Sequence, residues 1–175
     1  MDIRVGIGYD VHRLGEGLPF YLGGVKIPHR KGAIGHSDAD VLIHAICDAL
    51  LGAANLGDIG RQFPDNSDEF KGIDSKILLK RTLELIRQKK YKIVNIDSVV
   101  MLEKPKIKDY IERMQTVLAK VLEIDPDRVS VKATTTEGLS YIGKEKGVAA
   151  QAVVLISGEG STGKTDSQDS PDREP

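Results

Sequence analysis

The chain has no tryptophan, a single cysteine and an aromatic content of only 5% among its 175 residues. Because Cys47 has no second cysteine to pair with, an internal disulfide is excluded, and we expect a cytoplasmic protein. No apolar run approaches the length of a membrane span, and the start of the chain lacks the charged-then-apolar pattern of a signal peptide. The net charge of -1, with both signs interspersed, argues against binding to duplex nucleic acid or to a membrane.

Apolar residues are also missing from the end of the chain. None of the 18 residues from Gly158 to Pro175 is aliphatic, aromatic or sulfur-containing. Such a segment cannot offset its ordering entropy by burial. We therefore expect one folded domain over 1–157, followed by a disordered polar tail over 158–175.

This tail opens with GEGSTGKT, from Gly158 to Thr165, which satisfies the phosphate-loop pattern G-x-x-x-x-G-K-[ST]. The motif works only between a strand and a helix, because backbone amides at the helix start hold the phosphates. A strand before it is plausible, but the ten residues after Thr165 include two prolines and no apolar side chain. A P-loop nucleotide hydrolase is therefore a disfavoured alternative.

The remaining pattern predicts an α+β fold, with a mixed β-sheet flanked by helices on one side. The expected strands cover 3–11, 20–27, 93–102, 129–135 and 148–156. The first expected helix is capped by Ser37 or Asp38 and runs to about Leu56, and two further helices are expected over 74–89 and 107–123. The segment 57–72 is a long loop by its Gly, Pro, Asn and Asp content, and loops of this length are often functional.

The first candidate site is Asp10-Val11-His12, at the end of the first strand. Alternation along a strand puts Asp10 and His12 on one face and is expected to point Val11 into the core. A carboxylate and an imidazole on a common face are two of the ligands that a zinc site needs. A surface pair without metal is the alternative.

The second candidate site is HSDADVLIH, with His36 before a helix and His44 inside it. A buried imidazole needs partners for its nitrogens, and Asp48, one turn further on, could orient the His44 ring. A hydrogen-bonded core histidine is the alternative. Cys47, also one turn away, could supply a thiolate, or could be a small buried hydrophobe.

The third candidate site is the segment Lys132–Glu137, at a strand end. Its three threonines could donate hydroxyl and amide hydrogens to phosphate, and Glu137 could hold a hard divalent cation; β-propensity alone would also explain the threonines. Lys104-Pro105-Lys106 precedes a helix, where free amides and two cations could serve an anion or simply be solvated.

Taken together, these segments resemble the 2-C-methyl-D-erythritol 2,4-cyclodiphosphate synthase family, of the non-mevalonate isoprenoid route. The resemblance is carried, in order along the chain to about Ile156, by GYDVHR, GGVKIP, GHSDADVLIHAICDALLGAANLGDIGRQFPD and VKATTTEGLSYIGKEKG. It implies a homotrimer with active sites at the subunit junctions. It also implies zinc on Asp10, His12 and His44, and magnesium or manganese on Glu137.

The same resemblance implies that His36 and Thr135 are catalytic and stabilise the transition state. It implies that one group of residues lines the methylerythritol pocket: Asp58, Ile59, Gly60, Phe63, Pro64 and Asp65. It places the cytidine pocket at Leu102, Glu103, Lys104, Pro105, Lys106, Ile107 and Lys108. Further substrate contacts are expected from Asp10, Val11, His12, His36, Ser37, Thr134, Thr135, Thr136, Glu137, Tyr141 and Lys144. At Lys144 the family commonly has an arginine, so the bidentate contact to phosphate is lost there.

The implied enzyme is a phosphorus-oxygen lyase. It would convert 4-diphosphocytidyl-2-C-methyl-D-erythritol 2-phosphate to 2-C-methyl-D-erythritol 2,4-cyclodiphosphate, with release of CMP. The nearest alternative is a zinc-dependent phosphoesterase acting on a nucleotide-linked diphosphate, with water in the open position. A catalytically silent trimer that binds cytidine nucleotides or a partner enzyme is another alternative, although a binding module has no need for two cations.

Overall fold

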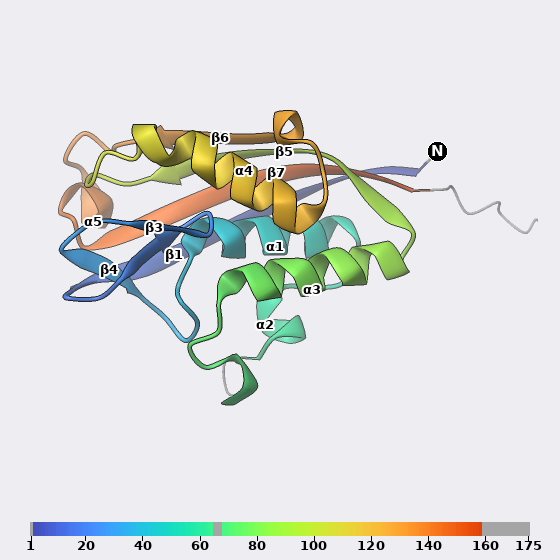
Figure 1. The fold of residues 1–175 in the computed structure, drawn as a ribbon, viewed down its shortest axis with the longest axis horizontal. Coiled ribbons are helices and arrows are strands. Elements are labelled where there is room, and N and C mark those ends of the chain that lie inside the picture. Colours follow the sequence, from blue (N-terminus) through green and yellow to red (C-terminus); the bar gives the residue numbers. More distant parts are fainter. Residues whose placement is uncertain (1, 65–67, 159–175) are drawn as a thin grey trace, which may run out of the picture.

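The computed structural model describes residues 2–64 and 68–158. One layer is a five-stranded sheet with the order β4-β1-β7-β5-β6, and helices form the other layer (Figure 1). The strands are β1 (Asp2–Glu16), β4 (Lys31–Ile34), β5 (Tyr91–Met101), β6 (Val129–Thr134) and β7 (Gly147–Gly158), with a separate hairpin of β2 (Phe20–Leu22) and β3 (Val25–Ile27). The helices are α1 (Val41–Ala53), α2 (Ile59–Gln62), α3 (Ser75–Gln88), α4 (Ile111–Leu122) and α5 (Ser140–Gly143). Among the described helices, none is both long enough and apolar enough to span a membrane.

The sheet is mixed, as the sequence predicts. β7 lies in its centre and pairs antiparallel with both β1 and β5. β6 pairs parallel with β5, and a parallel neighbour requires a crossover, which α4 provides. The expected α+β fold, with helices on one side of the sheet, is confirmed.

β1 separates its side chains strictly between the two faces. Gly6 and Gly8 are buried under α1, whereas Val5 and Ile7 are 66% and 65% exposed. The side chains of Ile3, Val5, Ile7, Tyr9 and Val11 lie on the face of β1 opposite α1, and we call them the outer row. The expectation that Val11 points into the core is wrong. Asp10 and His12 share the helix-covered face, so alternation sends Val11, which is 44% exposed, to the other side.

α1 is the central helix and lies between the sheet and α3. Its N-cap is Asp40, whose carboxylate accepts from the backbone amides of Ile43, Gly23 and Gly24. The prediction that Ser37 or Asp38 caps this helix is therefore wrong, because both side chains bond elsewhere. Asp40 instead ties the β2–β3 turn to the start of α1.

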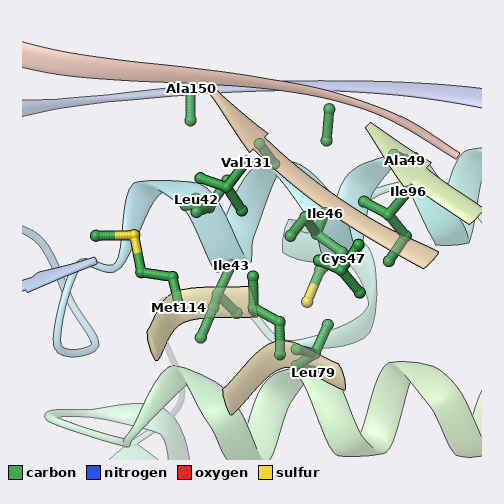
Figure 2. Close-up of a cluster of buried hydrophobic side chains, with 14 of the residues drawn as sticks. Leu42, Ile43, Ile46, Cys47, Ala49, Leu79, Ile96, Met114, Val131 and Ala150 are labelled. Atoms are coloured by element: carbon green, nitrogen blue, oxygen red, sulfur yellow. The ribbon is translucent and has the colours of Figure 1, made fainter. Parts of the chain in front are cut away.

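The main core fills the space around α1. In Figure 2, Leu42 and Ile46 lie among side chains from the strands, such as Val131 and Ala150, while Leu79 comes from α3. Cys47 is fully buried in the same cluster, and burial raises the pKa of its thiol to about 12. The interpretation of Cys47 as a small buried hydrophobe is confirmed.

Four further differences separate the structure from the sequence prediction. The short strand β4 was not expected. The long loop contains α2 and a 3-10 turn at Asp68–Phe70, and the helix expected from 107 begins at Ile111 after a 3-10 turn at Lys108–Tyr110. Gly158, assigned to the tail, is the last residue of β7. The rest of the tail and of GEGSTGKT lies outside the described residues.

Candidate metal centre and active site

The site begins with a close approach of α1 to β1. A Cβ atom on Gly6 would lie 1.9 Å from the Ala49 carbonyl oxygen, and one on Gly8 would lie 1.9 Å from that of Ala45. Only glycine permits this contact. The next residues on the same face of β1 are Asp10 and His12, and they meet His44 of α1.

Asp10, His12 and His44 converge on one point. The Asp10 Oδ2 atom lies 3.0 Å from His12 Nε2 and 3.0 Å from His44 Nδ1, and the two nitrogens are 3.1 Å apart. The three side chains are 25%, 17% and 12% exposed, so the cluster is sheltered but reachable. The expectation that β1 and α1 bring these three residues together is confirmed.

Electrostatics at this cluster favour positive charge. Burial acts to raise the pKa of Asp10, but its hydrogen bonds with His12 and His44 outweigh burial, and the pKa is lowered. Burial acts to lower the pKa of His12, and the Asp10 carboxylate outweighs it, so that pKa is raised. The cluster therefore holds an ionised carboxylate beside the two imidazoles, an arrangement that favours a bound cation.

The geometry fits a metal ion. Tetrahedral ligands at about 2.0–2.1 Å from a metal lie about 3.3 Å from one another, close to the separations of these three atoms. The His12 Nδ1 atom lies 3.1 Å from the carbonyl oxygen of Ile34, on β4, and donates to it, which leaves Nε2 facing the cluster. Among the described residues, this trio is the group of three or more His, Cys, Asp or Glu side chains whose ligand atoms converge closely enough to hold a metal ion, and Glu137 is not part of it.

The outer nitrogen of His44 is held by hydroxyl groups. His44 Nε2 lies 2.9 Å from Ser75 Oγ and 3.0 Å from Ser37 Oγ. The prediction that Asp48 orients this ring is wrong, because Asp48 accepts from the backbone amide of Ile59 at 2.7 Å. Sequence reasoning missed Ser75, which is 31 positions from His44 and carries no local signal beyond starting a helix.

His36 lies in the segment between β4 and α1. Its side chain is exposed, and its carbonyl oxygen accepts from the Gly72 amide at 2.7 Å. Ser37, the next residue, is half-buried against His44 and Ser75. The segment thus reaches from the metal trio to the long loop.

The long loop is anchored at both of its described ends. Asp58 caps α2 by accepting from the Arg61 amide, and Ile59 is held by Asp48. Phe63 is buried against Phe70, with ring centroids 5.6 Å apart. Gly60 and Pro64 are exposed, and Asp65 lies outside the described residues. Asp58, Gly60 and Pro64 therefore remain accessible to a ligand, whereas the buried Phe63 side chain anchors the loop through its contact with Phe70.

A second group of candidate residues lies at the end of β6. The Thr135 hydroxyl donates to Glu137 Oε1 at 3.1 Å, and the Thr136 amide donates to Glu103 at 3.4 Å. The Leu102 amide donates to the Thr134 carbonyl oxygen at 3.0 Å, so the two expected substrate segments lie side by side. Within the second segment, Leu102 and Ile107 are buried, Glu103 and Pro105 are half-buried, and Lys104, Lys106 and Lys108 are exposed.

Two further candidates are Tyr141, inside α5, and Lys144, at the end of this helix. The hydroxyl of Tyr141 lies 3.1 Å from that of Tyr9, and the hydrogen bond with Tyr141, together with burial, raises the pKa of Tyr9 to about 12. Lys144 is exposed at the C-cap of α5. Lys104 pairs with Glu145 at 3.1 Å, and this pair lowers the pKa of Glu145. Lys104 therefore also connects the candidate cytidine segment to the end of α5.

Comparison with known proteins matches the described domain along nearly its whole length. The model of the YgbB family matches residues 3–157. A 2-C-methyl-D-erythritol 2,4-cyclodiphosphate synthase of Bacteroides fragilis is 60% identical over 157 residues, which are 90% of this chain and 99% of the relative. The bifunctional IspDF of Campylobacter jejuni is 44% identical with a TM-score of 0.87, over 90% of this chain and 43% of that one. The IspF of Plasmodium falciparum, solved as a CDP complex, is 37% identical with a TM-score of 0.79, over 90% and 97%. The chain therefore belongs to the YgbB family, whose curated relatives at this level of identity are 2-C-methyl-D-erythritol 2,4-cyclodiphosphate synthases.

Proposed function

We propose that this chain converts 4-diphosphocytidyl-2-C-methyl-D-erythritol 2-phosphate to 2-C-methyl-D-erythritol 2,4-cyclodiphosphate and CMP, as a phosphorus-oxygen lyase of isoprenoid precursor synthesis. The observation that carries the proposal is the trio of Asp10, His12 and His44, with ligand atoms 3.0 to 3.1 Å apart, in a chain 60% identical to such a synthase. A cytoplasmic location is part of the proposal, since the one cysteine is a buried free thiol.

Zinc is the metal that we assign to the trio. Two imidazoles and one carboxylate form the three-ligand set of catalytic zinc sites, which keep a fourth position open for substrate. When bound, zinc would supply Lewis-acid charge neutralisation to the substrate diphosphate. The protein's own contribution is to hold the three ligand atoms on two packed elements, β1 and α1, so that the site needs little reorganisation.

Glu137 is the residue that we assign to a second cation, magnesium or manganese. Its side chain is exposed at the strand end, and one of its oxygens already accepts from Thr135. Carboxylate oxygens suit hard divalent cations that retain several waters. Thr135 and His36 would act by donating hydrogen bonds to charge that develops on the transferring phosphoryl group.

In this reaction the side chains position the reacting groups and form no covalent bond with them. An oxygen of the 2-phosphate forms a bond to the β-phosphorus. The bond from that phosphorus to the bridging oxygen breaks, and its electron pair leaves with CMP. Both reacting groups are anionic, so neutralising charge on either side of them is the main requirement. No external nucleotide is consumed.

We assign the substrate contacts to two groups of candidate residues, one in the long loop and one at the ends of β5 and β6. We assign the methylerythritol unit to the loop residues Asp58, Ile59, Gly60, Phe63, Pro64 and Asp65. We assign the cytidine to Leu102–Lys108 and the diphosphate to Thr134–Glu137, with Ser37, Tyr141 and Lys144 nearby. Cytidine recognition is supported by the CDP complex of the Plasmodium falciparum relative. The contact of the Leu102 amide with Thr134 supports a single continuous surface for both assignments.

A homotrimer with active sites at subunit junctions completes the proposal. The outer row of β1 is apolar and exposed, and Val153 of β7 continues it at 41% exposure. An apolar sheet face of this kind usually marks an interaction surface. A second copy of the chain would cover the outer row. It would also bring Glu137 and the threonines at the end of β6 of one subunit towards the metal trio of another.

Turnover of the cytidyl substrate, followed by phosphorus NMR, tests the function. We expect a cyclic diphosphate together with CMP, and metal analysis of the same sample should find zinc. An open-chain monophosphate would instead identify a zinc-dependent phosphoesterase. Substrate binding without turnover in the metal-loaded protein would identify a silent binding protein and would refute the proposal.

A further inference from the structure

The hydroxyl group of Ser75 lies between the His44 ring and the carboxylate of Asp38. Ser75 is the first residue of α3, and its side chain is fully buried. Its hydroxyl donates to Asp38 Oδ1, and its backbone amide donates to Asp38 Oδ2 at 3.2 Å. On the other side, Ser75 Oγ lies 2.9 Å from His44 Nε2. Asp38, Ser75 and His44 thus form a relay that ends at the candidate metal centre.

The hydrogen count along this relay decides which atom donates. A serine hydroxyl has one hydrogen, and here the hydrogen points to the Asp38 carboxylate, which can only accept. The Ser75 oxygen must therefore accept in its contact with His44. His44 Nε2 consequently carries a hydrogen, because two lone pairs at 2.9 Å would repel each other.

Ser37 is consistent with this assignment. Its oxygen already accepts from the Ala39 amide at 3.1 Å, and it lies 3.0 Å from His44 Nε2 and 3.4 Å from Ser75 Oγ. If Ser37 directs its own hydrogen towards Ser75, it can share the hydrogen on His44 Nε2 as a second acceptor. Every polar hydrogen in the group then has a partner.

We infer that Ser75 is a positioning residue for the metal centre, and that Asp38 sets its orientation. By accepting from Nε2–H, Ser75 directs the lone pair of His44 Nδ1 towards Asp10 and His12. Asp10, 3.0 Å from Nδ1, attracts a proton to that atom in the absence of metal, so Ser75 acts against the competing arrangement. The inference rests on the proposed metal site, and it adds α3 to the elements that shape that site.

Two measurements on purified protein test the inference. The first is zinc affinity, by competition with a chromophoric chelator. Loss of an outer partner of a metal-bound histidine typically weakens affinity by about 10–100-fold, and we expect this loss in Ser75→Ala. Ser75→Thr retains a hydroxyl and should remain close to wild type. Thr82→Val removes another fully buried hydroxyl from the same helix and should leave affinity unchanged.

The second measurement is hydrogen exchange of the His44 Nε2–H signal in proton–nitrogen NMR, assigned with a His44→Gln variant. The signal should be protected from exchange in wild type with or without zinc, because Ser75 accepts from Nε2–H in both states. In Ser75→Ala, where Ser37 remains as the second acceptor, this signal should exchange markedly faster with water. If Ser75→Ala does not fold, the wild-type signal and the affinity of Asp38→Asn, in which an amide can donate to Ser75, still decide the matter.

The outcomes distinguish the inference from the proposed function. Wild-type zinc affinity in Ser75→Ala or Asp38→Asn, or an unprotected Nε2–H in wild type, would overturn the relay and leave the function intact. A protected Nε2–H in a wild-type protein that binds no zinc would support the relay and refute the metal centre.

Discussion

Gly8 packs directly against α1, and we predict that adding one methyl group there, in Gly8→Ala, will distort the metal centre although Gly8 is not a ligand. In Gly8→Ala the new Cβ atom would lie 1.9 Å from the Ala45 carbonyl oxygen. Carbon–oxygen contacts in proteins are about 3.3 Å or longer, so α1 must move away from β1 by about 1.4 Å. The oxygen belongs to the backbone of a helix, and a rotamer change cannot relieve the clash.

The consequence for the site follows from where the ligands lie. His44 is on α1 and its partners Asp10 and His12 are on β1, so the displacement separates the ligands directly. Functional sites need their groups within about 0.5 Å of the working geometry, and the displacement is larger than that. We expect zinc affinity and turnover to fall by at least about tenfold, and stability to fall by about 1–3 kcal/mol from overpacking.

The assays are zinc competition, turnover and thermal unfolding of Gly8→Ala beside a matched control. Gly52→Ala makes the same substitution on α1, where a Cβ atom would meet no other atom within 4 Å. The control should bind zinc normally and should be slightly more stable, because alanine favours helix by about 0.5–1 kcal/mol over glycine. Normal zinc affinity in a folded Gly8→Ala protein would show that the close approach does not set the ligand geometry.

Four other predictions use different parts of the molecule. His44→Ala should lose bound zinc and turnover together, and full activity in a metal-free His44→Ala protein would contradict the assignment. Removal of residues 159–175, which keeps Gly158 in β7, should leave steady-state turnover unchanged; a loss of ATP or GTP binding with the tail would instead favour a P-loop. Ile7→Asp should dissociate the trimer in sedimentation experiments, whereas Ile77→Asp, at an exposed position of α3, should not. Cys47 should resist iodoacetamide in the native protein at about pH 8 and react once unfolded, since its raised pKa of about 12 keeps the thiol protonated below that pH; rapid native labelling in mass spectra would contradict its burial.

The main elements were predictable because hydrophobic periodicity is strong in them. Alternation identified β1, a continuous apolar run identified β7, and the apolar stripe identified α1. The meeting of Asp10, His12 and His44 was expected from the family resemblance. Alternation alone does not show which face of a strand is covered, and for that reason Val11 was assigned to the wrong side. β4 was missed because its four residues are too few to show a period.

The immediate surroundings of the metal trio were less predictable. Helical spacing placed Asp48 one turn from His44, but the outer nitrogen of the ring faces α3 and not its own helix. Its real partner, Ser75, bonds to Asp38 across 37 positions of sequence. Partners of this kind arise from the packing of two helices, and a single sequence contains no periodic signal for such contacts.

The two faces of β1 have different roles, and this difference limits how the protein can change during evolution. Even-numbered residues from Gly6 to His12 serve the helix contact and the ligands, and odd-numbered residues form the outer row. A one-residue insertion or deletion in a strand exchanges its two faces. Such an event between Gly6 and His12 would place isoleucine and valine against α1 and turn the ligands outward. Substitutions on the outer row that keep it apolar are compatible with this arrangement, whereas a change in the length of this segment is not.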